Sequence, residues 1–271
     1  MGLLSGSKDH SPNPPGSDSL PVVKRLDQVL VDRGLSESRA RAQRSIMAGQ
    51  VRINGQPARK AGDAVRDTDT VELLAGDRYV SRGGHKLEHA LVHFGLEVSG
   101  WLALDVGAST GGFTDCLLQH GASRVFAVDV GQGQLAWRLR QDPRVVVMER
   151  TNARRLTASA FPPDLGGFQL VVMDCSFISL RLILPSVAPL LRPGGRMVAL
   201  VKPQFEAGKD EVDRGAGVIT DPEVHARVLA ELEEFVRTQP LGVVWQGVTA
   251  SPLLGPAGNR EFLALLSSST L

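Results

Sequence analysis

Seven short apolar runs recur between residues 101 and 266, and the segments between them carry helical spacing. The runs cover residues 101–106, 124–129, 144–148, 169–174, 196–201, 242–248 and 261–266. Such an alternation is typical of strand–helix–strand units built around a parallel sheet. It therefore predicts an α/β fold for this part of the chain, with the last long helix near residues 222–238.

The first apolar run leads into a glycine-rich turn, Gly107-Ala-Ser-Thr-Gly-Gly-Phe-Thr. A strand, a glycine turn and a helix in this order let the backbone approach a ligand closely. A dinucleotide site would read G-x-G-x-x-G, but position 109 is serine. Asp105 lies just before the turn and would repel a pyrophosphate. The turn therefore suits a cationic ligand such as S-adenosylmethionine better than the NAD of an oxidoreductase.

Two further strand ends support a nucleotide-like cofactor. Asp129 ends the second run, 22 residues after Gly107, where it would meet ribose hydroxyls. Asn152 follows the third run and could meet the adenine edge. We therefore predict that S-adenosylmethionine contacts a set of residues at these strand ends: Asp105, Gly107, Ala108, Ser109, Gly111, Gly112, Phe113, Asp129, Asn152 and Asp174.

Four charged residues lie next to apolar segments, where charged side chains are unusual unless they have a function or a partner. Asp174 and Lys202 each end an apolar run, Lys86 lies at the start of a predicted helix, and Glu261 begins the last run. Ligands of open α/β sheets gather at the carboxyl ends of parallel strands. Asp174 and Lys202 are therefore expected to converge on the cofactor crevice.

Residues 23–74 have a different pattern. Two predicted helices, the second with Ser36 as a candidate N-cap, precede Val51-Arg-Ile-Asn-Gly. Asn54-Gly55 is a strong hairpin signal, and another short strand closes the segment near residues 69–73.

The net charge of +1, from 30 basic and 29 acidic residues, hides an uneven distribution. Residues 21–80 hold eleven Lys and Arg against eight Asp and Glu, a net charge of +3. A cluster of this kind either follows a phosphate backbone or forms a solvated helix face. The candidate RNA-binding residues are Arg25, Arg39, Arg41, Arg44, Arg52, Arg59 and Lys60.

The helix–helix–hairpin order of the N-terminal segment resembles the S4 RNA-binding domain. The pattern Lys86, Asp174, Lys202, Glu261 resembles the K-D-K-E tetrad of FtsJ-like ribose 2′-O-methyltransferases. Together these features resemble the TlyA family, whose members often carry the older name hemolysin. The matching strings include Ser81-Arg-Gly-Gly-His-Lys-Leu, Asp174-Cys-Ser-Phe-Ile-Ser-Leu, Val201-Lys-Pro-Gln-Phe-Glu and Gly258-Asn-Arg-Glu-Phe. One departure is Arg214-Gly-Ala-Gly-Val, where the family usually has paired glycines.

The resemblance implies a Rossmann-like S-adenosylmethionine-dependent methyltransferase sheet with a small N-terminal α+β S4 RNA-binding domain. It also implies methylation of a cytidine ribose 2′-hydroxyl in ribosomal RNA, within ribosomal subunits. A ribose hydroxyl is a poor nucleophile and needs a base within hydrogen-bond reach. We hypothesise that Lys202 is this base and that the nearby Lys86 either lowers the pKa of Lys202, as a second cation would, or positions the hydroxyl. Asp174 and Glu261 would orient the lysines and the substrate, and Phe177 could stack on a flipped base.

The domain boundaries follow from these patterns. We expect a disordered tail at 1–22, an S4-like domain at 23–76, a linker at 77–82 and the methyltransferase domain at 83–271. No His, Cys or acidic grouping has metal-ligand spacing, so no metal is expected. Without an apolar run of about 18 residues or a signal peptide, we expect a cytoplasmic protein with no membrane partner. The sequence identifies no protein partner. The alternatives are an RNA-binding protein with a non-catalytic methyltransferase fold and a membrane-active hemolysin.

Overall fold

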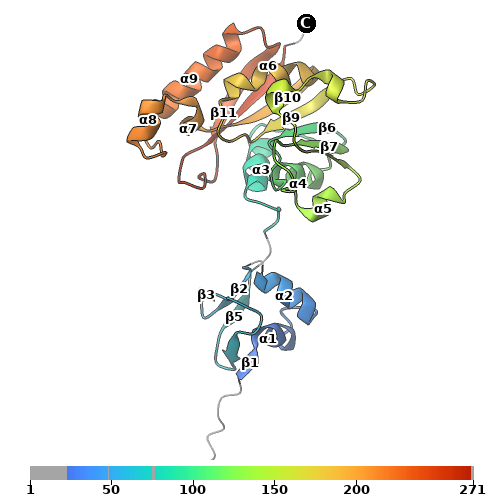
Figure 1. Ribbon diagram of the computed structural model, residues 1–271, viewed down its shortest axis with the longest axis vertical. Coiled ribbons are helices and arrows are strands. Elements are labelled where there is room, and N and C mark those ends of the chain that lie inside the picture. The colour runs from blue at the N-terminus through green and yellow to red at the C-terminus, as the bar shows by residue number, and fades with distance from the viewer. Residues whose placement is uncertain (1–22, 48, 75–76, 270–271) are drawn as a thin grey trace, which may run out of the picture. The chain divides into compact units, whose positions relative to one another are not determined.

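A computed structural model describes residues 23–47, 49–74 and 77–269 (Figure 1). The chain divides into two compact units, residues 1–76 and 77–271. The predicted disordered tail at 1–22 lies outside the described residues.

The first unit packs two helices against short strands. A two-stranded sheet pairs β1 with β4, and β2 lies between β3 and β5 in a second, antiparallel sheet. Asn54 and Gly55 both have positive φ, +50° and +77°, which the tight turn between β2 and β3 requires. Apolar side chains from both helices and from β2, β4 and β5 form the core, as the S4 pattern predicts. The elements are β1 (Val23–Arg25), α1 (Leu26–Asp32), α2 (Arg39–Met47), β2 (Val51–Ile53), β3 (Gln56–Pro57), β4 (Ala64–Arg66) and β5 (Val71–Leu73).

The prediction that Ser36 caps the second helix is wrong. α2 begins at Arg39, and the Ser38 hydroxyl accepts a hydrogen bond from the Arg41 N–H at 3.3 Å. Ser36 belongs to the end of α1 instead, because its N–H donates to the carbonyl of Leu30 at 3.0 Å.

The second unit is built on a seven-stranded sheet with the order β11-β12-β10-β9-β6-β7-β8. Each predicted apolar run supplies one strand. The pairs from β10 to β8 are parallel, but β12 is antiparallel to both of its neighbours, so the sheet is mixed rather than wholly parallel. The strands are β6 (Leu102–Val106), β7 (Arg124–Val128), β8 (Val145–Met148), β9 (Phe168–Met173), β10 (Leu191–Val201), β11 (Val243–Ala250) and β12 (Phe262–Ser268).

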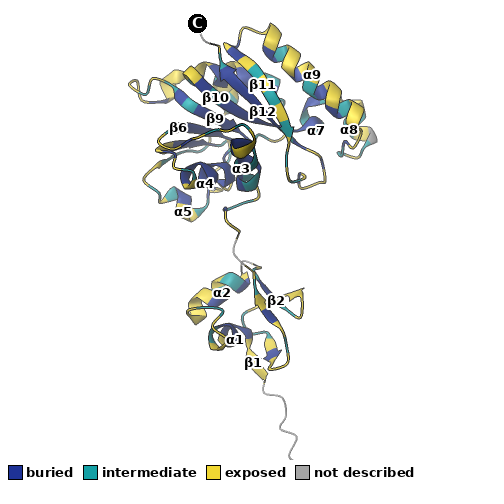
Figure 2. Ribbon diagram, turned by 180° about the vertical axis from the view of Figure 1, so that it is seen from behind, coloured by how far each residue is buried: buried dark blue, intermediate teal, exposed yellow. Residues whose placement is uncertain are grey.

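Helices cover both faces of this sheet, which leaves its central strands buried (Figure 2). α3 (Gly83–His93), α4 (Gly112–Gln119) and α5 (Trp137–Arg140) pack on one face. α6 (Leu184–Val187) and α9 (Pro222–Thr238) pack on the other. The short helices α7 (Pro203–Glu206) and α8 (Lys209–Arg214) follow β10. The switch point of the strand order, where ligands bind in such folds, lies between β6 and β9.

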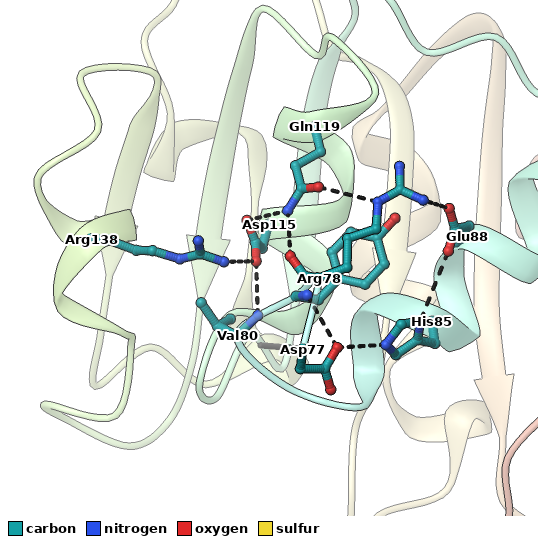
Figure 3. A network of polar contacts seen from close by, with 9 residues as sticks. Asp77, Arg78, Val80, His85, Glu88, Asp115, Gln119 and Arg138 are labelled. Carbon is teal, nitrogen blue, oxygen red and sulfur yellow. Dashed lines mark hydrogen bonds and ion pairs between the residues drawn. The ribbon is translucent and has the colours of Figure 1, made fainter. Parts of the chain in front are cut away.

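Residues 77–82, which we expected to form a linker, pack against α3 and α4. Tyr79 is only 2% exposed, and the Asp115 carboxylate accepts a hydrogen bond from the Val80 N–H at 2.8 Å. Figure 3 shows the polar network that holds this segment. The segment is therefore part of the second unit, because the Tyr79 ring is buried there and the Val80 N–H is hydrogen-bonded there.

Candidate active site

The glycine-rich turn fits closely against the end of β9. Gly107 has φ of +85°, and a Cβ atom there would lie 2.6 Å from the carbonyl oxygen of Asp174. A side chain at position 107 would therefore push β6 and β9 apart. The turn is also tied to β7, because the Ser109 N–H donates to Asp129 Oδ2 at 2.8 Å.

Two adjoining pockets open at this edge of the sheet. The larger has a volume of about 580 Å³ and the smaller about 220 Å³. Four residues line both pockets, so the two meet there: Gly107, Ser109, Asp174 and Ser176.

Most of the predicted cofactor residues line one or both pockets. Asp129 and Asn152 line the larger pocket, where Asp129 also accepts the Gly131 N–H at 2.6 Å. Asn152 Oδ1 accepts the Arg154 N–H at 3.0 Å. The smaller pocket is lined by Ala108, Gly112 and Phe113.

Two of the predicted cofactor residues, Asp105 and Gly111, line neither pocket. Gly111 packs against α5, where a Cβ atom would lie 2.3 Å from Leu139. The Asp105 side chain accepts a hydrogen bond from the Thr114 hydroxyl at 2.6 Å, so it is bound to α4 instead. Both residues shape the turn from behind rather than facing the pockets.

Asp105 is fully buried, and its second oxygen has no hydrogen-bond partner among the described residues. Burial, strengthened by the negative charges of Asp174 and Asp129 and opposed by Thr114, raises the pKa of Asp105 to about 7.

The four predicted catalytic residues form two separate ion pairs. Lys202 Nζ lies 2.7 Å from Asp174 Oδ1, and Lys86 Nζ lies 2.5 Å from Glu261 Oε2. All four line the smaller pocket. Both lysines and Glu261 are buried, whereas the Asp174 side chain keeps 24% of its surface exposed. Each cation thus has its own carboxylate.

Glu261 reaches this edge because β12 runs against the parallel strands. Phe262 pairs with Val201, so the start of β12 lies beside the end of β10. Glu261, which precedes β12, therefore lies at the same edge of the sheet as Lys202, which follows β10.

Sequence reasoning did not identify Ser176. The Lys202 ammonium donates a hydrogen bond to Ser176 Oγ at 2.7 Å. Its place two residues after Asp174, at the same strand end, is the signal that could have revealed it.

Phe177 has an unusual conformation for an aromatic residue. Its φ is +63° and it is 90% exposed, with its ring centroid 5.2 Å from that of Phe205. It borders the larger pocket. A bulky residue held in the left-handed region at a pocket rim points to a functional role.

The predicted RNA-binding residues are all exposed, but they fall into two groups. Arg25 and Arg39 pair with the fully buried Asp27 at 3.1 and 3.0 Å, and Arg41 pairs with Glu37 at 2.7 Å. In the part of the first unit that the structure describes, the remaining side chains have no hydrogen-bond or ion-pair partner: Arg44, Arg52, Arg59 and Lys60. Arg25 and Arg39 thus stabilise the fold, since they keep the pKa of Asp27 well below its usual range.

The larger pocket fits the adenosine part of S-adenosylmethionine. Asp129 is available for ribose hydroxyls, and the wall includes the apolar side chains of Val130, Ile178 and Ile183. Its volume lies within the range of small-molecule sites. Gly107 contributes no side chain to the wall where the two pockets meet. The residues present therefore fit this cofactor.

Two other kinds of functional feature are absent from the residues that the structure describes. Within residues 23–47, 49–74 and 77–269, no helix has the length and apolar character needed to cross a membrane. Over the same residues, no cluster of three or more His, Cys, Asp or Glu side chains could hold a metal ion.

Comparisons with known proteins agree with this geometry. The profile of the FtsJ-like methyltransferase family matches residues 79–268, and that of the S4 domain matches residues 24–71. The 16S/23S rRNA (cytidine-2′-O)-methyltransferase TlyA of Mycobacterium tuberculosis is 50% identical over 249 residues, which cover 91% of this chain and 90% of the relative. Hemolysin A of Brachyspira hyodysenteriae is 41% identical over 89% of this chain and 98% of its own length. A solved structure of a hemolysin-named protein from Streptococcus thermophilus is 44% identical, with a TM-score of 0.69 over 93% of this chain and 90% of that one.

Proposed function

The chain belongs to the TlyA family of FtsJ-like methyltransferases, and from this premise we propose that it methylates the ribose 2′-hydroxyl of a cytidine in ribosomal RNA. The methyl donor is S-adenosylmethionine. One observation carries the proposal: a buried lysine amine, Lys202 Nζ, lies in the smaller pocket beside two residues that also line the larger one. Lys202, the proposed base, thus lies next to the pocket that would hold the cofactor.

The larger pocket would hold the adenosine part, with Asp129 on the ribose and Asn152 near the adenine. When bound, S-adenosylmethionine supplies an electrophilic methyl group on a positively charged sulfur. The smaller pocket would then receive the ribose hydroxyl of the RNA.

Lys202 takes the proton of the 2′-hydroxyl as the oxygen attacks the methyl carbon. To act as the base, the Lys202 ammonium first releases one proton to solvent, and Asp174 holds the resulting amine in place through the 2.7 Å contact. Because the leaving group is a neutral thioether, the step needs no metal ion to stabilise it. General-base assistance of this kind contributes about 10²- to 10⁴-fold to the rate.

Lys86 positions the hydroxyl. It is not a free positive charge beside Lys202. Glu261 balances its charge at 2.5 Å, so its effect on the other amine is reduced. An ammonium group can still donate a hydrogen bond to the ribose oxygen.

The first unit would bind folded ribosomal RNA through its unpartnered cations, Arg44, Arg52, Arg59 and Lys60. Phe177 would stack on the flipped cytosine, since its exposed ring borders the cofactor pocket. The substrate is the RNA of ribosomal subunits, so the reaction would take place in the cytoplasm.

Labelled S-adenosylmethionine tests the proposal directly. The full chain is incubated with unmethylated small subunits, large subunits and whole ribosomes, and the label is mapped by primer extension at limiting nucleotide. We expect a 2′-O-methyl group on a cytidine of at least one subunit. Both subunits are included because the name of the Mycobacterium tuberculosis relative covers 16S and 23S RNA.

The variant Lys202→Ala provides the control for chemistry. We expect it to lose methylation and to retain S-adenosylmethionine binding by calorimetry. Near-normal turnover by this variant would remove Lys202 as the base. An unmodified RNA that is nevertheless bound by the wild-type protein would favour the non-catalytic RNA-binding alternative.

A further inference from the structure

Among the described residues, Ser176 is the only hydrogen-bond partner of the Lys202 Nζ atom, and Asp174 is the ion-pair partner of the same atom. We propose that Ser176 is a positioning residue that aims the lone pair of the Lys202 amine at the substrate hydroxyl. The proposal rests on the methyltransferase function argued above. It assigns a role to a residue outside the Lys86–Asp174–Lys202–Glu261 tetrad.

A neutral amine has a directional shape. It carries two N–H bonds and one lone pair, in roughly tetrahedral directions. Ser176 Oγ accepts a hydrogen bond from Lys202 Nζ at 2.7 Å, and the Asp174 carboxylate lies 2.7 Å from the same atom as its ion-pair partner. The hydrogen bond fixes one N–H direction, and the negative charge of Asp174 turns the lone pair away from its own side.

The charge of Asp174 alone would not achieve this. An ion pair has little directional preference, so rotation about the Cε–Nζ bond would still move the lone pair among several directions. The hydrogen bond to Ser176 stops that rotation. Because rates depend steeply on the alignment of reacting groups, this hydrogen bond matters for the chemical step.

The bonds of the step balance with Ser176 in this role. The ribose O–H bond breaks and its proton goes to Lys202 Nζ, while the new O–CH₃ bond forms. The S–CH₃ bond breaks and its electron pair stays on sulfur. The resulting ammonium has three N–H bonds: one remains on Ser176, Asp174 balances the positive charge, and one proton is then released to solvent.

The loop that carries Ser176 is fixed on both sides. At its start, the Asp174 carbonyl packs against Gly107, where a Cβ atom would come within 2.6 Å. Farther on, the Glu206 carboxylate accepts hydrogen bonds from the Ser179 hydroxyl and the Leu180 N–H, both at 2.6 Å. Ser176 is therefore held at a set distance from the end of β10, which carries Lys202.

A purely structural role fits these hydrogen bonds less well. Ser176 is exposed, and Lys202 is the only hydrogen-bond partner of its hydroxyl among the described residues. Removing this hydroxyl deletes a hydrogen bond to the base and none that holds the loop.

The test compares Ser176→Ala and Ser176→Thr in the full chain, with ribosomal subunits as substrate. For Ser176→Ala we expect kcat to fall about 10- to 100-fold, while KM for the subunit and Kd for S-adenosylmethionine stay within about twofold of wild type. Ser176→Thr keeps the hydroxyl and should restore most of kcat. The matched control is Ser123→Ala, since Ser123 bonds the Trp101 carbonyl at 3.0 Å at the opposite edge of the sheet.

Three results would overturn the inference. These are an unchanged kcat in Ser176→Ala, a defect confined to KM or cofactor affinity, and a kcat loss that Ser176→Thr does not restore. If the wild-type protein itself methylates no subunit, the proposed function fails first and this inference fails with it. The wild-type reaction separates these cases.

Discussion

Asp105 is a carboxyl group enclosed by protein, and its charged form has almost no water to stabilise it. Its pKa is raised to about 7, whereas that of an unfolded Asp lies near 4. Between these two pH values the unfolded chain has released a proton that the folded protein keeps. Folding stability from this group is therefore complete below about pH 4 and is lost as pH rises to about 7, by up to about 4 kcal/mol.

The variant Asp105→Asn should remove this pH dependence, because the amide does not titrate. Urea unfolding at pH 5, 6, 7 and 8 would show the free energy of unfolding falling more steeply for wild type than for the variant. The difference in the free energy of unfolding between the two proteins cancels the contributions of the other carboxyl groups. One of these is Asp27, whose pKa is shifted the opposite way. Parallel curves would contradict the prediction.

Glu261 and Lys86 form a buried ion pair in which each charge is stabilised by the other. The two side chains are 1% and 8% exposed, so neither charge is well hydrated. Replacing Glu261 with Gln leaves the Lys86 charge buried without a counter-charge. We expect Glu261→Gln to lower the free energy of unfolding by about 3 kcal/mol and to abolish methylation.

The double variant Lys86→Met, Glu261→Leu separates these two effects. Apolar replacement of a buried ion pair is often neutral for stability, so the double variant should recover most of the loss. It should still fail to methylate RNA. Wild-type stability in Glu261→Gln would show that the pair is not energetically coupled.

At the scale of elements, strand positions could be read from the sequence, but one strand direction could not. Apolar run length located all seven strands, and the polar residues that end them located Asp174 and Lys202. The antiparallel direction of β12 depends on pairing with β10, which is distant in sequence, and no local pattern encodes it. The packing of residues 77–82 on α3 and α4 escaped prediction for the same reason, since Tyr79 fills its site only after the helices meet.

Glu206 connects two of these elements. Its buried carboxylate, whose pKa burial raises, joins α7 to the loop after β9 through Ser179 and Leu180. In Glu206→Ala the Leu180 N–H loses its partner, so we expect a destabilisation of about 1–3 kcal/mol. Hydrogen exchange should rise in residues 176–180 and methylation should fall. The control Glu233→Ala changes an exposed carboxylate on α9, and equal exchange in the two variants would rule out the connection.

At the scale of the whole molecule, a net charge of +1 combines units of opposite sign. Residues 21–80 carry +3, and the rest of the chain is slightly acidic. General attraction to RNA is therefore modest, and binding depends on where the cations lie. Structured RNA is recognised largely by shape and backbone contacts, which suits a small basic domain.

The unpartnered cations of the first unit should account for much of the salt dependence of RNA binding. In the full chain, the triple variant Arg44→Gln, Arg52→Gln, Arg59→Gln removes three exposed charges whose side chains make no hydrogen bond or ion pair with the described residues. Each cation that no longer meets a phosphate should lower the slope of log affinity against log salt by about one. We therefore expect weaker binding to ribosomal subunits with a salt slope smaller by about three, and unchanged Kd for S-adenosylmethionine. The matched control is a triple variant of the second unit with the same charge change, Arg124→Gln, Arg192→Gln, Arg196→Gln, at the sheet edge opposite the pockets. An equal drop in affinity in both triples would mean that net charge, and not the first unit, attracts the RNA.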